Sequence, residues 1–393
     1  MSPFEHRLNR QVTNRRGIIM KRGGMALLCA VLLLSTSVRA VEVSAPSAIL
    51  MEKETGTVLF AKDEHKQLEP ASVTKVMTLL LTMEAIDGGQ LGYDDMVTAS
   101  AHACSMGGSQ IWLKEHEQLS VSDMLKAVCV VSANDCAVAL AEAVAGSEDT
   151  FVERMNQRAA ELGMNDTTFK NATGLPAAGH VTSAYDIALM SRELVLNHPD
   201  IRQYTTIWMD TLRNGESQLV NTNRLVRFYE GATGLKTGST DSALYCLSAT
   251  AEREGMELIA VVMKGATSAQ RFEDAQTLLS HGFAGYALRK VVPDQALPPV
   301  PVELGAQATV QPVPGEGGTL LLEKAKAGNL AQSVALEESV AAPVALGDRL
   351  GTLTVISGEE TVAEIPLLAG EEVPRVTYGQ MFLRLLRTAC LAG

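Results

Sequence analysis

Three short motifs that suit acyl transfer occur in a fixed order along the 393-residue chain. Together they supply a nucleophilic hydroxyl, two lysines, a second hydroxyl and an amide. A fold that uses them has to bring together three distant parts of the chain. The motifs are Ser72-Val73-Thr74-Lys75, Ser132-Ala133-Asn134 and Lys236-Thr237-Gly238.

The first motif pairs a serine with a lysine one helical turn later. A serine is a poor nucleophile until a base takes its proton. Residues three apart share a helix face, so Lys75 is expected to reach the Ser72 hydroxyl. Because an ordinary lysine pKa of about 10.4 leaves the amine protonated at neutral pH, burial or a nearby cation must lower it. We therefore expect Lys75 to be a neutral general base beside a charged Lys236.

The other two motifs supply groups that protonate and bind parts of a substrate. Ser132 is expected to relay a proton to the leaving amine, and Asn134 to orient a substrate amide through its donor and acceptor. Lys236 and Thr237 suit a terminal carboxylate. Gly238 permits close backbone approach, which leaves strand amides free to pair with an extended substrate.

Two backbone N–H groups are predicted to bind a developing oxyanion. Ser72 lies at a predicted helix N-terminus, where its own N–H has no intrahelical partner. The second donor is expected from the strand after Gly238, namely the N–H of Ser239.

Each motif also has a purely structural interpretation. Ser-x-x-Lys is a common spacing, Asn134 could simply cap a helix, and Lys236-Thr237-Gly238 could end a loop. Their occurrence in order, each where a helix or strand is expected to begin, favours the chemical interpretation.

The hydrophobic pattern predicts an α/β (α+β) catalytic domain with an antiparallel sheet and a helical insert. A central buried helix is expected to begin near Ser72 and to end at Gly88-Gly89. Strands are expected on both sides of a turn at 54–57 and again over 243–251 and 257–263. Further helices are expected over 122–131, 135–145, 147–162, 183–197 and 268–279.

The composition changes at about Val291. A proline-rich segment over 292–301, a linker or an edge strand, precedes short alternating runs that predict a small all-β domain. The last residues form an amphipathic pattern that either lies in a membrane interface or docks on the β domain. The predicted parts are a signal peptide over 1–40, a catalytic domain over 41–287, a β domain over 288–372 and a tail over 373–393.

The first 40 residues predict export, because a basic stretch precedes an apolar run from Met25 to Leu34 and a cleavage site at Val38-Arg39-Ala40. Without them, 26 basic and 44 acidic residues remain, a net charge of −18. Such a surface repels polyphosphates, so no nucleic-acid partner is expected. No C-x-x-C pair or His/Cys cluster occurs, so neither a metal nor another cofactor is predicted.

With their flanking residues, the motifs resemble those of the low-molecular-mass penicillin-binding proteins, which are serine-type D-alanyl-D-alanine carboxypeptidases. The resemblance includes Pro70–Thr78, Val131–Asp135, Gly234–Gly238, and the stretch from Asn171 through His180 to Asp186. It covers nearly the whole mature chain.

The resemblance implies a serine β-lactamase/penicillin-binding-protein-like catalytic domain that removes the terminal D-alanine from peptidoglycan pentapeptide through an acyl-enzyme on Ser72. It implies capture by β-lactam antibiotics and a location outside the cytoplasm, at the cell wall or the outer face of the cytoplasmic membrane. It also implies that Arg271 supports the carboxylate site. Two positions depart from the family, since Thr173 and Ser239 stand where some members carry a histidine.

Two alternatives remain open. A class A β-lactamase shares the three motif types but needs a glutamate to activate the deacylating water. Glu193-Leu194-Val195-Leu196-Asn197 superficially fits the string that carries it, but lies on a predicted amphipathic helix and is interpreted as a decoy. The second alternative is a penicillin-sensing or wall-binding protein that is acylated without turnover.

Overall fold

The computed structural model describes residues 41–315, 318–328 and 330–391. The signal peptide predicted over 1–40 lies outside the described residues.

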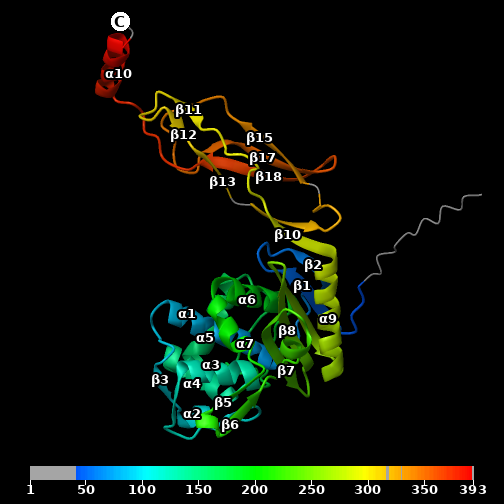
Figure 1. Ribbon diagram of the computed structural model, residues 1–393. Coiled ribbons are helices and arrows are strands. Elements are labelled where there is room, and N and C mark those ends of the chain that lie inside the picture. Colours follow the sequence, from blue (N-terminus) through cyan, green and yellow to red (C-terminus); the bar gives the residue numbers. More distant parts are fainter. Residues whose placement is uncertain (1–40, 316–317, 329, 392–393) are drawn as a thin grey trace, which may run out of the picture. The chain divides into compact units, whose positions relative to one another are not determined.

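A five-stranded antiparallel sheet organises the first part of the described chain (Figure 1). The first strand of the described chain, β1, pairs with β9 from residues 256–265, and Ser47 of β1 lies opposite Met263 of β9. Distant parts of the chain therefore complete one sheet, as the sequence predicted. The strands, in spatial order, are β2 (Val58–Lys62), β1 (Ser47–Glu52), β9 (Met256–Gly265), β8 (Leu244–Arg253) and β7 (Ala232–Thr240).

Alternating side chains along the sheet enter two different hydrophobic cores. Ile49 and Met51 of β1 join the core formed by the inserted helices. Ala48 and Leu50 join a second core with the apolar face of the last helix of this domain, which lies on the other side of the sheet.

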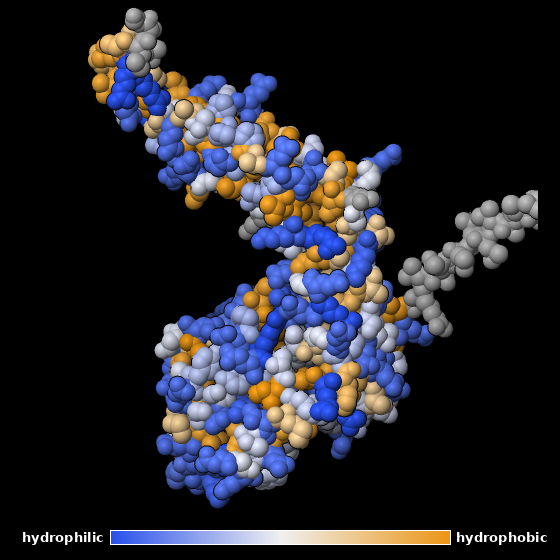
Figure 2. Space-filling model, in the orientation of Figure 1, coloured by the Kyte–Doolittle hydropathy of each residue, from blue (hydrophilic) through white to orange (hydrophobic). Residues whose placement is uncertain are grey.

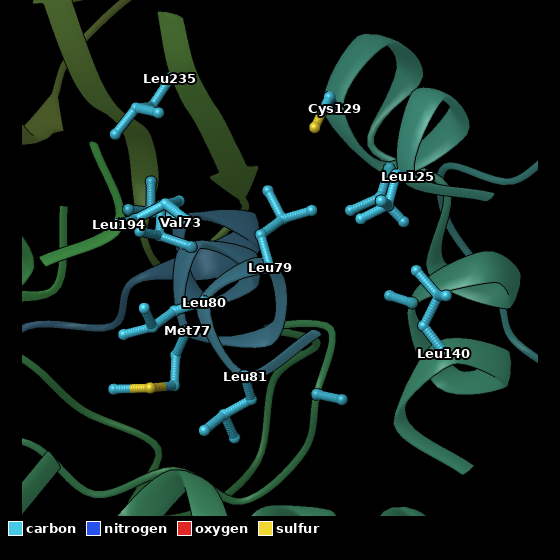
Figure 3. Packing of buried hydrophobic residues seen from close by; sticks show 14 of the residues in the cluster. Val73, Met77, Leu79, Leu80, Leu81, Leu125, Cys129, Leu140, Leu194 and Leu235 are labelled. Carbon is cyan, nitrogen blue, oxygen red and sulfur yellow. The ribbon is translucent and has the colours of Figure 1, made fainter. Parts of the chain in front are cut away.

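The helical insert lies between β2 and β7 in the sequence. Its central helix is buried on most faces, and Figure 3 shows Leu79 of this helix facing Leu125, with Leu140 nearby. The longer helices are α1 (Lys75–Asp87), α3 (Val121–Val131), α4 (Asn134–Ala145), α5 (Glu148–Glu161), α6 (Ala184–Asn197) and, after the sheet, α9 (Ser268–Gly285). Short ones are η1 (Ala71–Thr74), α2 (Ala101–Cys104), η2 (Pro199–Ile201), α7 (Arg202–Thr205), η3 (Arg213–Gly215) and α8 (Leu225–Phe228).

Two small antiparallel pairs border the helical insert. One joins β3 (Met96–Thr98) to β4 (Gln118–Ser120), and the other joins β5 (Met209–Leu212) to β6 (Ser217–Val220). Neither pair was expected from the sequence.

The C-terminal part is built from short strands and a terminal helix, α10 (Tyr378–Leu391). Its sheets have the orders β12-β11-β16 and β13-β18-β17-β15, and β10 pairs with β14. These strands are β10 (Tyr286–Lys290), β11 (Val300–Glu303), β12 (Thr309–Val310), β13 (Pro312–Pro314), β14 (Thr319–Glu323), β15 (Leu330–Leu336), β16 (Val340–Ala341), β17 (Arg349–Ser357) and β18 (Glu360–Ala369).

Most element boundaries lie within one or two residues of the sequence predictions, and the larger differences have physical reasons. The segment expected to begin the central helix at Ser72 is a 3-10 turn, and the α-helix begins at Lys75. Helix α9 continues six residues beyond 279, to Gly285. Gly282 lies within this helix and has a packing role. The absence of a side chain lets the helix approach Leu258 closely, since an added Cβ would lie 2.5 Å from the Leu258 Cδ1. The proline-rich segment is extended chain that enters a strand only at Val300.

Candidate active site

Ser72 and Lys75 lie at the junction of η1 and α1, one turn apart. The Nζ atom of Lys75 is 3.0 Å from the Ser72 Oγ, 2.5 Å from the Oδ1 of Asn134 and 2.7 Å from the backbone oxygen of Thr173. A neutral amine has two N–H donors and one lone pair. Its N–H groups match the two carbonyl oxygens, and its lone pair is left to accept the Ser72 hydroxyl proton.

The surroundings of Lys75 favour this neutral form. The side chain is fully buried, and desolvation, followed by the nearby charge of Lys236, lowers its pKa well below the usual value. Asp135 acts in the opposite direction on the same pKa. The pair of lysines expected from the sequence is therefore close enough to interact.

The second motif lies in the connection between α3 and α4. Ser132 ends α3 with a left-handed backbone (φ 65°), and its buried Oγ has no hydrogen-bond partner among the described residues. The alternative in which Asn134 caps a helix is wrong, because Ala133 occupies the N-cap and Asn134 is the first residue of α4. The Asn134 amide instead accepts from Lys75 and donates to the Gly107 carbonyl at 2.6 Å.

Asp135, for which the sequence indicated no role of its own, fixes the loop beside this motif. Its fully buried carboxylate accepts the N–H groups of Ile111 at 3.1 Å, Leu113 at 3.0 Å and Cys136 at 2.9 Å. The carboxylate thus holds the loop against α4 and adds a negative charge near Lys75.

The loop over 171–180 supplies the second carbonyl acceptor of Lys75, the backbone oxygen of Thr173. The Asn171 side chain accepts the N–H groups of Thr173 and Gly174 at 3.2 and 2.7 Å, which shapes a tight turn. Gly174 has φ +82°, and a Cβ there would lie 1.8 Å from the Ala71 oxygen. The Thr173 hydroxyl donates to Asn171, so its side chain is engaged within the loop.

His180 attaches the same loop to the nucleophile segment. Its Nδ1 accepts the Lys170 N–H at 3.3 Å, and its Nε2 lies 2.9 Å from the Thr74 Oγ1. Burial lowers the pKa of His180 to about 4, so at neutral pH the ring is uncharged and Nε2 donates to Thr74.

The third motif lies on β7, at the edge of the sheet. A Cβ added to Gly238 would lie 2.9 Å from the backbone nitrogen of Ser72, so the absence of a side chain allows β7 to approach the nucleophile. Ser239 follows on the same strand, opposite Tyr245. The Thr237 hydroxyl donates to Thr222 at 2.7 Å, a residue for which the sequence gave no signal.

Lys236 and Arg271 both donate hydrogen bonds to backbone carbonyls of this strand. The Nζ of Lys236 donates to the Thr237 carbonyl at 2.9 Å, and burial lowers its pKa to about 7. Arg271 donates to the carbonyls of Gly238 at 3.0 Å and Cys246 at 3.3 Å, and desolvation lowers its pKa to about 10. Arg271 therefore holds the strand that carries the motif.

Glu193, which fits the lactamase-like string, belongs to another cluster. On α6 it accepts from Arg158 of α5 at 2.7 Å, and Arg158 also binds Glu84 at 2.8 Å. Glu84, Glu193 and His198 are the one group of potential metal-ligand residues in the described chain. Ion pairs with Arg158 already engage both carboxylates, so the cluster serves a structural role.

Comparisons with known proteins give the same family as the motifs. Residues 34–267 match the family model described as D-alanyl-D-alanine carboxypeptidase, and residues 286–375 match the C-terminal domain of penicillin-binding protein 5. The D-alanyl-D-alanine carboxypeptidase DacF of Bacillus subtilis is 40% identical over 339 residues, which cover 85% of this chain and 87% of that protein. The D-alanyl-D-alanine carboxypeptidase DacC of Escherichia coli is 32% identical over 346 residues, which cover 86% of this chain and 86% of that protein.

Solved structures of penicillin-binding proteins match the fold of this chain. Penicillin-binding protein 5 from Haemophilus influenzae matches with a TM-score of 0.75 and 28% identity, covering 85% of this chain and 98% of that one. Penicillin-binding protein 6B from Escherichia coli matches with a TM-score of 0.70 and 32% identity, covering 84% and 96%. These matches confirm the predicted fold class.

Proposed function

Because the chain belongs to the D-alanyl-D-alanine carboxypeptidase family, we propose that Ser72 is its nucleophile and Lys75 its general base. The protein is a serine-type carboxypeptidase of the penicillin-binding class. The observation that supports these roles is the set of three contacts at Lys75 Nζ, which directs the lone pair of a neutral amine at the Ser72 hydroxyl.

In the acylation step, the Ser72 Oγ attacks the carbonyl carbon between the two D-alanines, and Lys75 takes the hydroxyl proton. The N–H groups of Ser72 and Ser239 bind the oxyanion. When the C–N bond breaks, Ser132 delivers a proton to the leaving amine. Ser132 regains that proton from Lys75, so the base returns to its neutral form.

In the deacylation step, water attacks the ester on Ser72. The ester bond breaks, one water proton returns to the Ser72 oxygen, and the peptide leaves shortened by one D-alanine. The same base that accepted the serine proton is available to take the proton from water.

The substrate terminus is bound by the third motif. Lys236 and Thr237 bind the terminal carboxylate. Asn134 binds the substrate amide, and the edge of β7 pairs with the extended substrate backbone. The family acts on peptidoglycan that ends in D-Ala-D-Ala and binds β-lactams. We assign stem peptides ending in D-Ala-D-Ala and β-lactam antibiotics as the ligands of this site, because both present an acyl group to Ser72 and a carboxylate to Lys236.

The decisive experiment is release of D-alanine from a peptide ending in D-Ala-D-Ala by the purified protein. We expect release by the wild type, and loss of both release and covalent penicillin labelling in Ser72→Ala. Stable labelling without release would favour the non-turnover alternative. Rapid penicillin hydrolysis without peptide cleavage would favour a lactamase, and labelling retained by Ser72→Ala would refute the nucleophile.

A second proposal concerns location. We propose that the chain is exported and that α10 lies in the membrane interface. Among the described helices, none is long and apolar enough to cross a bilayer. Figure 2 shows hydrophobic residues on one side of α10 and hydrophilic residues on the other, and Tyr378, Phe382 and Leu385 are exposed.

The tail is tested by its removal. We expect deletion after Pro374 to release the protein from membranes while D-alanine release in solution continues. Phe382→Ser combined with Leu385→Ser should weaken membrane binding in the same direction, since both substitutions remove apolar surface. Unchanged membrane retention after the deletion would contradict the interfacial helix and favour the docked alternative.

A further inference from the structure

A polar groove of about 700 Å³ borders the second motif on the surface of the catalytic domain. One wall is the loop that precedes β4, and the other is the β5–β6 hairpin, with Val131 beside Ser132 at the base. Its principal lining residues are Gln110, Trp112, Lys114, Val131, Glu216 and Gln218. A volume of this size is in the range of sites that hold small ligands.

Trp112 dominates one wall and is held there by its neighbours. Its side chain is 74% exposed, and its backbone has φ +56°, which is unusual for a bulky residue. Asp135 binds the N–H groups on both sides of it, at Ile111 and Leu113. Strained backbone at a bulky residue persists where the surroundings fix it, and such residues cluster at ligand sites.

The opposite wall is attached to the same loop. Arg213 donates to the Ile111 carbonyl at 2.8 Å and to the Ser217 hydroxyl at 2.9 Å, and it binds Glu117 at 2.6 Å. Arg213 therefore joins the two walls of the groove, and the indole of Trp112 is exposed to solvent on a loop that these hydrogen bonds hold in place.

The loop that forms one wall of the groove is hydrogen-bonded to Asn134 of the second motif. The Asn134 N–H donates to the Ser109 carbonyl at 2.7 Å, and its side-chain amide donates to the Gly107 carbonyl at 2.6 Å. The loop that carries Trp112 is thus fixed by hydrogen bonds to the residue assigned above to the substrate amide.

We propose that this groove binds the part of the stem peptide that precedes D-Ala-D-Ala, with Trp112 as its aromatic wall. This inference rests on the proposed function. The leaving D-alanine is the C-terminal residue, so the substrate has no further segment on that side, and only the upstream peptide remains to be bound. Lys114 and Glu216 place charges of both signs beside the amides of Gln110 and Gln218, which matches a peptide with charged side chains.

The kinetic test compares two substrates in one variant. One is a short acylated D-Ala-D-Ala, and the other is the full pentapeptide. Trp112→Ala should raise KM for the pentapeptide about three- to tenfold with kcat unchanged, because a contact made equally in the ground and transition states affects binding alone. The short substrate should be cleaved as by the wild type, and Trp112→Phe should restore most of the pentapeptide KM. Leu346→Ala, which truncates an exposed residue of the β domain, is the control.

A binding test uses the fact that the chain has two tryptophans. In Ser72→Ala/Trp208→Phe, Trp112 is the sole fluorophore, and the pentapeptide should protect it from acrylamide while the short substrate does not. In Ser72→Ala/Trp112→Phe, Trp208 should show no such difference.

Four outcomes would overturn the inference. They are equal KM changes for both substrates, no change in KM for either, a change in kcat with KM unaltered, and equal protection of Trp112 from acrylamide by both substrates. Failure of the wild type to cleave the short substrate would instead refute the proposed function. The fluorescence test measures binding to Ser72→Ala variants, so its result does not depend on cleavage.

Discussion

The Nζ atom of Lys75 lies 2.5 Å from the Oδ1 of Asn134, although the two residues are 59 positions apart in the sequence. This contact joins the first motif to the second. The Asn134 amide is held on its other side by the Gly107 carbonyl, so the amide has a fixed orientation toward Lys75. The lysine is consequently positioned by hydrogen bonds, and its charge is set by burial.

The pH dependence of acylation should reveal both lysines. Lys75 acts as a base only when neutral, so the rate should fall as the pH drops below its lowered pKa. Lys236 attracts a carboxylate only when charged, and its pKa is about 7, so kcat/KM should fall as the pH rises above about 7. We expect a bell-shaped profile of kcat/KM for a peptide with a free terminal carboxylate.

Lys236→Arg provides the control for the basic limb. An arginine remains protonated at this pH, so the fall above pH 7 should disappear even if the altered geometry lowers the maximum rate. A wild-type kcat/KM that keeps rising through pH 9 would contradict the assignment of Lys236.

Asp135→Asn should change both stability and the acidic limb. An asparagine offers one acceptor where the carboxylate accepts from Ile111, Leu113 and Cys136, so the unfolding free energy should fall by about 1–3 kcal/mol. Removing the negative charge lowers the pKa of Lys75 further, so the acidic limb should move to lower pH.

The control for this variant is Asp123→Asn, which alters a partly exposed carboxylate paired with Lys126. Denaturant unfolding should give a loss within about 1 kcal/mol for Asp123→Asn, with the pH profile unchanged. An Asp135→Asn profile identical to the wild type would contradict electrostatic coupling to Lys75.

Gly174→Ala should strongly slow acylation of Ser72. The added Cβ would lie 1.8 Å from the Ala71 oxygen, so either the 171–180 loop or η1 must move, which displaces the Thr173 carbonyl from Lys75. A displacement of this order costs about a hundredfold or more in rate. The rate of penicillin labelling measures this loss, and circular dichroism checks that the labelled variant is folded.

Gly179→Ala is the matched control for Gly174→Ala. Gly179 has a similar backbone, with φ +78°, but the nearest atom to an added Cβ is 3.6 Å away. The strain of a left-handed alanine, about 1–2 kcal/mol, should lower stability but leave labelling intact. Equal loss of labelling in both variants would show that backbone strain, and not the contact with Ala71, is responsible.

The local chemistry of the chain made part of this fold predictable. Helices α3, α5 and α6 begin after Ser120, Ser147 and Ser183, whose hydroxyls each accept an N–H three residues later. Capping depends on neighbours in sequence and therefore leaves a readable pattern. The strand pair over 243–251 and 257–263 was predictable for the same reason, whereas the grouping of the three motifs was expected from their chemistry.

The contacts that complete the site leave no such pattern. The carbonyls of Thr173, Gly107 and Ser109 bind Lys75 and Asn134, but every residue has a carbonyl. Only the tertiary fold selects which one is used. The same contacts explain why Asn134 does not cap α4, because its side chain is engaged by Lys75 and Gly107.

Glu193→Gln distinguishes this site from that of a class A β-lactamase, in which a glutamate activates the deacylating water. Glu193 is bound to Arg158, so we expect the rate at which penicillin leaves Ser72 to be unchanged. Loss of a partly buried ion pair should lower the unfolding free energy by about 1 kcal/mol or less. Glu84→Gln removes the other partner of Arg158 and should cost a similar amount. Accumulation of the acyl-enzyme in Glu193→Gln, but not in Glu84→Gln, would assign Glu193 to deacylation and revive the lactamase alternative.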